Sequence, residues 1–241
     1  MHMSKRAAHA APAAVSSDVT DVRLLRLLQL SSATLPVGAY AYSHGLEQAA
    51  SRGWVTDEAT LGDWTCGLIE HALGTLDVPV LGRLCNAWRT ADEVTARRWM
   101  KFCSACRESG ELALEEHQLG TSLARVLTNL GIARAAPFTS DAQTTYLGMY
   151  ALAVVEFDIE VAAAANALLF AWTENQVGCA TRLLPLGQLA AQRVLSRAVQ
   201  IIPRVVDLSM NLADDELCSS AIGLGIASAL HETQYCRLFR S

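Results

Sequence analysis

The chain has 241 residues, including 39 Ala and 34 Leu, and its net charge at pH 7 is −5. Apolar residues make up 51% and charged residues 18%, which excludes a disordered chain, because so much apolar surface cannot stay in water. The acidic balance argues against nucleic acid as a partner, because phosphate binding requires a clustered basic excess. The preference for Ala and Leu over β-branched residues favours helix over sheet. We therefore predict one compact all-α domain with a substantial core.

The first twenty residues contain a basic pair but no Leu or Ile, and His9 and Pro12 interrupt any apolar stretch. This pattern does not match a secretory signal, so we predict a disordered N-terminal extension over residues 1–20. The cysteines are odd in number and irregularly spaced, which favours free thiols in a reducing cytoplasm. Residues 161–172 form the most apolar run, which is too short to span a membrane and predicts a buried core helix.

Apolar residues recur at three- and four-residue spacing almost everywhere after Asp18, and no convincing run has the period of a strand. This spacing predicts about ten helices joined by short connections. In chain order they cover roughly 20–31, 45–51, 56–73, 77–88, 92–108, 111–130, 141–157, 159–177, 185–200, a segment that Pro203 opens or kinks, and 214–231.

Local signals set the predicted helix ends. Pro36 and Gly38 break the first helix, and Asp77 with Pro79 is expected to start a new one. Gly110 is a plausible break, and Gly131 resembles a helix C-cap before an interior loop over 131–141. No boundary divides the all-α unit over 21–230, and residues 231–241 form a polar tail.

Known catalytic motifs are absent from the sequence. His231 and Glu232 begin an HExxH-like run that lacks the second histidine, and no P-loop, GxGxxG or GxSxG occurs. Cys103 and Cys106 have CxxC spacing without a second pair, so we expect packed cysteines. The consecutive residues Glu115, Glu116 and His117 should point in different directions.

Three polar clusters differ from the apolar pattern around them. The first, residues 36–47 (PVGAYAYSHGLE), lies at a helix break. The second, residues 172–176 (WTENQ), ends a predicted apolar helix and could equally be a frayed, solvated last turn. The third, residues 231–241 (HETQYCRLFRS), either packs on its own domain or docks on a partner, and the residues alone favour neither.

These clusters resemble the signatures of the urease accessory protein UreF family. Residues 27–49 resemble the first signature, 172–193 the second and 231–241 the C-terminal one, where Cys236 stands in place of a common Ser. Residues 107–123 resemble a fourth, mid-chain pattern, with Gly110 in place of the usual Thr or Ala. The resemblance runs in order from about Val22 to Ser241.

The resemblance implies an all-α, dimeric protein that is not an enzyme. Members of this family act with UreD (also called UreH) and the GTPase UreG, between which UreF forms a bridge. Together they couple GTP hydrolysis to nickel delivery into apo-urease, which UreF reaches through UreD. The chain itself is then expected to bind no cofactor tightly, since GTP is bound by UreG and nickel is handled by the complex.

The resemblance also implies partner-binding residues within the three clusters. They are Pro36, Gly38, Tyr42, Ser43, His44, Glu47, Glu174, Asn175, Gln176, His231, Glu232, Thr233, Gln234, Tyr235, Arg237, Leu238, Phe239 and Arg240.

The two faces are assigned from these clusters. We expect the UreG-facing surface at Tyr42, His44 and Glu47, together with Glu174 and Gln176. We expect the UreD-facing surface on the tail, at Arg237, Leu238, Phe239 and Arg240. Phe239 would be a buried anchor and the arginines would pair with carboxylates. Deleting residues 232–241 should then leave a folded protein that no longer binds UreD.

Nickel prefers imidazole and thiolate ligands, so His44, His231 and Cys236 are candidates for transient contact. They are scattered over separate motifs, and no tight site is expected. One alternative is a helical-bundle enzyme acting on an apolar small molecule, which would need a convergent acid–base or nucleophile pair. Another is a peripheral membrane protein, but the acids at 156, 158 and 160 beside the most apolar helix argue against it.

Overall fold

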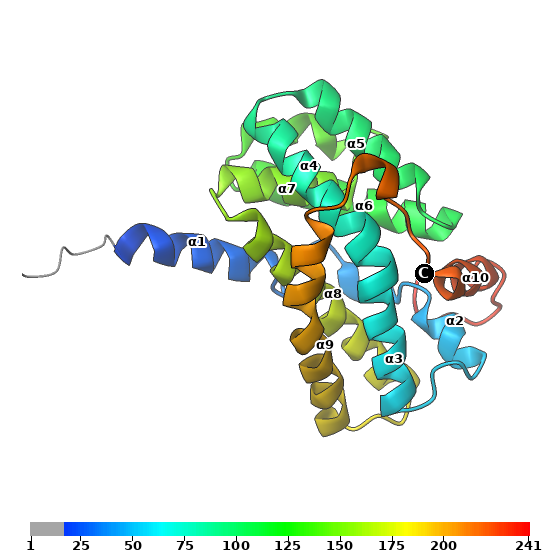
Figure 1. Cartoon of the computed structure of the whole chain (residues 1–241). Coiled ribbons are helices and arrows are strands. Elements are labelled where there is room, and N and C mark those ends of the chain that lie inside the picture. The colour runs from blue at the N-terminus through cyan, green and yellow to red at the C-terminus, as the bar shows by residue number, and fades with distance from the viewer. Residues whose placement is uncertain (1–16) are drawn as a thin grey trace, which may run out of the picture.

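The computed structural model describes residues 17–241, and every regular element in that range is helical (Figure 1). The ten α-helices are α1 (Ser17–Leu30), α2 (Leu46–Ser51), α3 (Glu58–Leu68), α4 (Val78–Arg89), α5 (Glu93–Ala105), α6 (Gly110–Asn129), α7 (Tyr146–Glu156), α8 (Val161–Leu183), α9 (Gln188–Ser209) and α10 (Ile222–His231). The shorter 3-10 or π elements are η1 (Ala39–Ala41), η2 (Ile69–Asp77), η3 (Ala133–Thr139) and η4 (Asp214–Glu216).

The main core surrounds α7, which α4, α5 and α6 enclose together with η3 (Figure 1). Helix α7 is apolar on all sides, which is typical of a helix buried on all sides. Trp88 on α4 is buried here, and its indole N–H donates to the carbonyl of Gly148 at 3.0 Å. The predicted all-α class and single compact domain are confirmed for the described residues.

A second, smaller core lies between α2, α3, the C-terminal half of α8 and the N-terminal half of α9. Leu46, Leu61, Val177 and Val194 are buried in it, and so is Phe239 from the tail. Phe239, near the C-terminal end, therefore fills a space between helices that precede it in the sequence.

Helix α1 projects from the body of the molecule (Figure 1). Leu30 at its end is buried in the main core, whereas Val22, Leu25 and Leu28 are 57%, 62% and 57% exposed. The helix begins at Ser17, so four residues that were assigned to the disordered extension are helical. The rest of that predicted extension, residues 1–16, lies outside the described residues.

The predicted break near residue 77 is wrong. Helices α3 and α4 join through the π-helical segment η2, so that one helical rod runs from Glu58 to Arg89. Asp77 caps no helix with its side chain, because its carboxylate is buried and binds Arg107 instead. At Gly74 a Cβ atom would lie 2.5 Å from Val205 on α9, so the wide turn packs closely against that helix.

Helix α8 is longer than predicted, because it continues past residue 177 to Leu183. Residues 172–176 are therefore well inside a helix, and the alternative of a frayed last turn is excluded. The helix ends where Leu184 becomes extended before Pro185, a residue that disfavours helix at the preceding position. Pro203 also differs from the prediction, because it lies within α9.

Two further helix boundaries differ from the predicted ones. Gly110 begins α6 instead of breaking it, because the preceding Ser109 caps the helix through the N–H of Leu112 at 3.1 Å. The predicted helix over 214–231 divides into η4 and α10, with Asp214 held by Arg83 at 2.6 Å. No helix in residues 17–241 is long and apolar enough to cross a membrane.

Candidate partner-docking site

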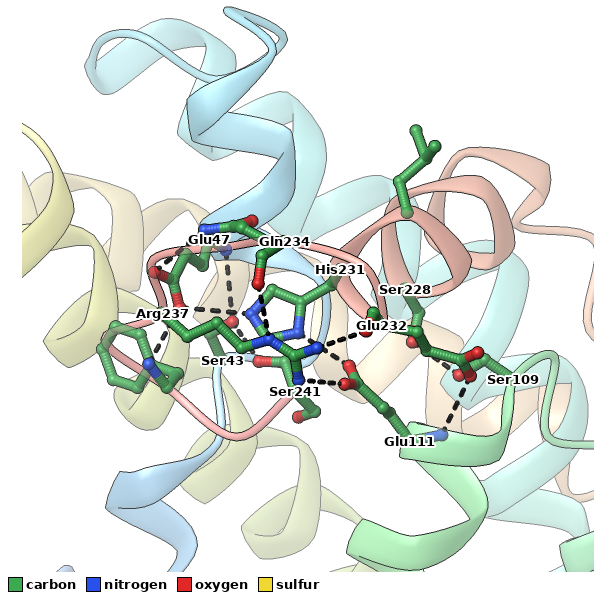
Figure 2. A network of polar contacts seen from close by, with 12 residues as sticks. Ser43, Glu47, Ser109, Glu111, Ser228, His231, Glu232, Gln234, Arg237 and Ser241 are labelled. Atoms are coloured by element: carbon green, nitrogen blue, oxygen red, sulfur yellow. Dashed lines mark hydrogen bonds and ion pairs between the residues drawn. The ribbon is translucent and has the colours of Figure 1, made fainter.

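The carboxylate of Glu47 is buried in the first turn of α2 and holds the C-terminal segment (Figure 2). Helix α2 begins there because Gly45 adopts a left-handed conformation, with φ of 79°, that glycine tolerates best. The N–H of Leu238 donates to Glu47 Oε1 at 2.7 Å, and the N–H of Phe239 donates to Oε2 at 2.8 Å. Such charge-assisted bonds fix the backbone of the tail to α2.

His231, at the end of α10, lies between two carboxylates (Figure 2). Its ring is fully buried, with Nδ1 2.7 Å from Glu111 Oε2 and Nε2 3.3 Å from Glu47 Oε2. Each ring nitrogen of His231 therefore faces a carboxylate oxygen. Arg237 Nη1 binds the other oxygen of Glu111 at 2.6 Å, so Glu111 joins the tail to α10.

The N-terminus of α6 is capped from α10. Glu232 Oε1 accepts hydrogen bonds from the N–H groups of Gly110 at 3.0 Å and Glu111 at 3.4 Å. The hydroxyls of Ser109 and Ser228 lie 2.6 Å apart beside them (Figure 2). A carboxylate at a helix N-terminus satisfies free N–H groups and opposes the helix dipole, which stabilises the contact.

The last residue of the tail is held by the first polar cluster. The main-chain oxygen of Ser241 accepts from the N–H of Ser43 at 2.9 Å, and the Ser241 hydroxyl lies 2.5 Å from Glu115 Oε2. Glu115 Oε1 also lies 3.4 Å from His44 Nδ1. Burial by itself lowers the pKa of His44, but the carboxylate of Glu115 outweighs it, so the pKa is raised above 6.5.

Two amide side chains on α8 hold the same loop from the other side. Asn175 Nδ2 donates to the carbonyl of Tyr42 at 3.0 Å, and Gln176 Nε2 donates to that of Ser43 at 2.9 Å. Trp172 packs edge-on against His44, with ring centroids 5.8 Å apart. The three polar clusters, which are far apart in the sequence, therefore meet in one junction, which we call the tail junction (the loop 42–47, residues 172–176 of α8, and residues 231–241).

Comparison with known proteins places the chain in one family. The model of the UreF family matches residues 55–199, which is more than half of the chain. The urease accessory protein UreF of Alkalilimnicola ehrlichii is 44% identical over 215 residues, covering 89% of this chain and 94% of that protein. The chain belongs to the UreF family.

Other UreF relatives match over a similar span. Urease accessory protein UreF 2 of Brucella anthropi is 40% identical, over 89% of this chain and 95% of its own length. UreF of Teredinibacter turnerae is 42% identical, over 90% of this chain and 98% of its own length. The chain is thus a urease accessory protein and not an enzyme, and the alternative of a helical-bundle enzyme is dropped.

The signature residues of this UreF chain fall into two groups that differ in solvent exposure. One group is buried or half-buried. It comprises Gly38, which precedes the tail junction, and the junction residues Tyr42, Ser43, His44, Glu47, Asn175, Gln176, His231, Gln234 and Phe239. The other group is exposed: Pro36, Glu174, Glu232, Thr233, Tyr235, Arg237, Leu238 and Arg240. In this exposed group, the charged ends of Glu232 and Arg237 are already bound within the chain.

The structure decides where the tail packs, which the sequence left open: it packs on its own domain. Phe239, expected as an anchor in a partner, is only 4% exposed and fills the second core, with the Arg182 guanidinium 4.5 Å from its ring centroid. Tyr42, Glu47 and Gln176 are likewise buried and present no surface for UreG. The Glu47 carboxylate and the Gln176 amide nitrogen are occupied by contacts within the chain.

Sequence reasoning missed Glu111, Glu115 and Ser241, which complete the tail junction. The two glutamates are four residues apart on α6, so they share one face of that helix. They lie within the segment 107–123 that resembles a UreF signature, and this was the available signal. Glu115, Glu116 and His117 do point in different directions, because they bind His44, Arg107 and the carbonyl of Thr144 respectively.

Within residues 17–241, one group of three ligand-type side chains is close enough to hold a metal ion: Asp77, Cys103 and Glu116. The guanidinium of Arg107 already lies among them, 2.6 Å from Asp77, 2.7 Å from Glu116 and 3.3 Å from Cys103. Burial also raises the pKa of the Cys103 thiol, which opposes the thiolate form that metals bind. We interpret this group as a buried ion cluster that ties α6 to η2.

The three candidates for transient nickel contact, His44, His231 and Cys236, do not come together in the described part of the chain. Both histidines face carboxylates of the chain itself, and Cys236 is exposed. Direct contact between these residues and nickel stays a prediction.

Proposed function

We propose that this UreF chain bridges UreD and the GTPase UreG and couples GTP hydrolysis to nickel delivery into apo-urease. The observation that carries the proposal is the tail junction, in which hydrogen bonds and ion pairs join three UreF signature segments. The buried members hold the backbone, and their neighbours in sequence remain exposed. A binding surface needs such positioning, because ordering loops at the moment of binding costs conformational entropy.

The UreD-facing surface in this proposal is the outer side of the tail. Tyr235 is fully exposed and Leu238 is 52% exposed, although their backbone is ordered. Helix α10, beside which the chain ends in Figure 1, adds Ile222 at 77% and Ile226 at 47% exposure. Exposed apolar side chains next to arginines are typical of protein interfaces, which supports this assignment.

The UreG-facing surface in this proposal is the exposed part of the first two clusters. Pro36 and Glu174 are exposed, and Tyr40 is 71% exposed between them in sequence. Tyr42, His44, Glu47 and Gln176 then act as positioning residues for this surface. Because one junction holds both surfaces, binding of UreD on the tail would affect the loop that meets UreG.

The proposal includes a homodimer in the cytoplasm. The exposed apolar side chains of Val22, Leu25 and Leu28 on the projecting α1 support a further interface, because such a stripe is unfavourable in water. The described cysteines, seven in all, are free, which suits a reducing compartment. Light scattering of the purified chain, with Leu25→Asp as the disrupting variant, measures the oligomeric state.

The bridging proposal is tested by co-expressing the chain with UreD and UreG and separating the complexes by size exclusion, with and without GTP. Deletion of residues 232–241 is unsuitable, because it also removes Phe239 from the second core. We use Leu238→Asp instead, with Leu189→Asp on α9 as the matched control, since that leucine is 77% exposed.

We expect Leu238→Asp to lose UreD from the complex, and therefore nickel loading of urease, while remaining folded by circular dichroism. Leu189→Asp should co-purify like the unmodified chain. Full retention of UreD by Leu238→Asp, or equal loss in both variants, would contradict the proposed surface. Absence of UreG from every complex would contradict the bridging role itself.

A further inference from the structure

A cavity of about 420 Å³ opens between the end of α1, the loop that follows it, and helices α6, α7 and α8. Most of its wall area is apolar, with Leu35, Leu119, Leu147 and Leu168 among the lining side chains. The inner wall also carries the buried ion cluster of Arg107. The size and the mainly apolar lining are typical of sites for small organic molecules.

The carboxylates on the inner wall of this cavity are already used by the chain. Both oxygens of Asp77 accept from Arg107, and Glu116 accepts from Arg107 and from the N–H of Leu147 at 2.9 Å. Glu115 is bound to His44 and Ser241. A cation at this inner wall would therefore have to break existing ion pairs before it found a ligand.

The buried polar groups that lack a hydrogen-bond partner on this wall are donors. Arg107 Nε and Trp172 Nε1 are buried and have no hydrogen-bond partner among residues 17–241. The phenol of Tyr146 makes no hydrogen bond to the described residues, and burial raises its pKa, so it stays protonated. Buried donors without partners are unfavourable, and most in folded proteins are satisfied by protein, water or ligand.

We propose that this cavity binds a neutral, planar, mainly apolar molecule that presents a carbonyl-type oxygen to these donors. Neutrality follows from the charges, because the lining carboxylates of Asp77, Glu115, Glu116 and Glu174 outnumber the basic groups of Arg107, Arg182 and His44 and leave no positive excess for an anionic ligand. The apolar walls favour a ring system, and the free N–H groups favour an acceptor at its buried end. This binding site is independent of the bridging function proposed above.

Prodan, a neutral naphthalene ketone whose emission shifts to the blue in apolar surroundings, serves as the probe. We expect saturable one-to-one binding to the full-length chain with a blue-shifted emission. The matched ligand is 2-dimethylaminonaphthalene, which lacks the ketone and should bind about 3- to 10-fold more weakly, as loss of one hydrogen bond predicts. Equal affinity of the two ligands would overturn the role of the donors.

Gly178 on α8 lines the cavity, and a Cβ atom there meets nothing within 4 Å. Gly178→Phe should therefore fill the space and weaken Prodan binding at least tenfold. Gly67→Phe on α3 is the matched control, because that glycine is equally open and lies outside the cavity. Unchanged affinity in Gly178→Phe, or the same loss in Gly67→Phe, would overturn the location of the site.

Trp172→Phe gives a second variant, which keeps an aromatic ring but removes Nε1 and makes the side chain smaller. We expect it to weaken the binding of Prodan about 3- to 10-fold more than the binding of the ketone-free ligand, because only Prodan loses a hydrogen bond. Ni²⁺ added to the Prodan complex should not displace the probe. Displacement by Ni²⁺ in the unmodified chain would show a cation site and overturn the proposed ligand class.

Discussion

Single buried side chains connect helix α2 of this UreF chain to its C-terminal tail. The carboxylate of Glu47 receives two backbone N–H groups of the tail and faces His231, so each buried charge has a partner. Removing one member of a buried ion pair typically costs about 3–5 kcal/mol, because the other charge stays buried and unpaired. His44 and Glu115 form a second such ion pair, at the wall of the cavity. The strength of this pair is expected to depend on pH.

Stability is expected to depend on pH through His44. Its pKa in the folded chain is raised above the unfolded value of 6.5, because Glu115 favours the imidazolium. A raised pKa adds stability that is complete below pH 6.5 and is lost as pH rises through the folded value. We compare urea unfolding of the unmodified chain and His44→Asn at pH 6 and pH 9, since Asn tolerates the left-handed backbone (φ 52°) at this position.

The stability difference between the two proteins should be larger at pH 6 than at pH 9. A difference that is constant between these pH values would show that the ion pair with Glu115 contributes nothing. Glu174→Gln, at an exposed carboxylate on α8, is the control and should leave the pH dependence unchanged.

Between helices, small residues are required where the backbones of two helices lie very close together. Helix α6 passes so near the start of α7 that a Cβ atom on Gly120 would lie 2.4 Å from the backbone carbon of Thr145. Backbone cannot move aside as a flexible side chain can, so this contact needs glycine. Gly178 on α8 is the opposite case, because nothing lies within 4 Å of its Cβ position.

The same substitution should therefore have opposite effects at these two glycines. Gly120→Ala is expected to lower the free energy of unfolding by about 1–3 kcal/mol, through overpacking between α6 and α7. Gly178→Ala should raise it by about 0.5–1 kcal/mol, because alanine restricts the unfolded chain and favours helix. Urea unfolding monitored by circular dichroism measures both, and changes of the same sign would contradict the packing argument.

The molecule as a whole is built from two cores, and the tail closes the smaller one. Phe239 contributes the aromatic ring that fills the space between α2, α8 and α9, while Glu47 holds the backbone beside it. The tail therefore stabilises the second core as well as forming an exposed surface. Loss of its contacts should destabilise the second core and leave the main core intact.

Phe239→Ala is expected to cost about 3–5 kcal/mol, the usual range when a buried aromatic side chain is removed. Hydrogen exchange should become faster in α2 and in the N-terminal half of α9, with little change in α7, which lies in the main core. Leu238→Ala is the control, because that neighbour is 52% exposed. Equal acceleration across both cores would mean that they unfold as one unit.

The sequence by itself determined the all-helical class, most helix positions and the UreF signatures, because apolar spacing, caps and turn residues act over a few neighbouring positions. Two predictions of helix ends from the sequence were wrong. Asp77 looked like a helix start, but its carboxylate binds Arg107. The polar residues 172–176 looked like the end of α8, but Asn175 and Gln176 bind the backbone of residues 42–43. Only the tertiary structure decided which signature residues are buried and that the tail packs on its own chain. The hydrogen bond from the N–H of Phe239 to the Glu47 carboxylate joins residues 192 positions apart. Contacts between such distant residues decide which side chains are buried or paired, and a local sequence pattern contains no information about them.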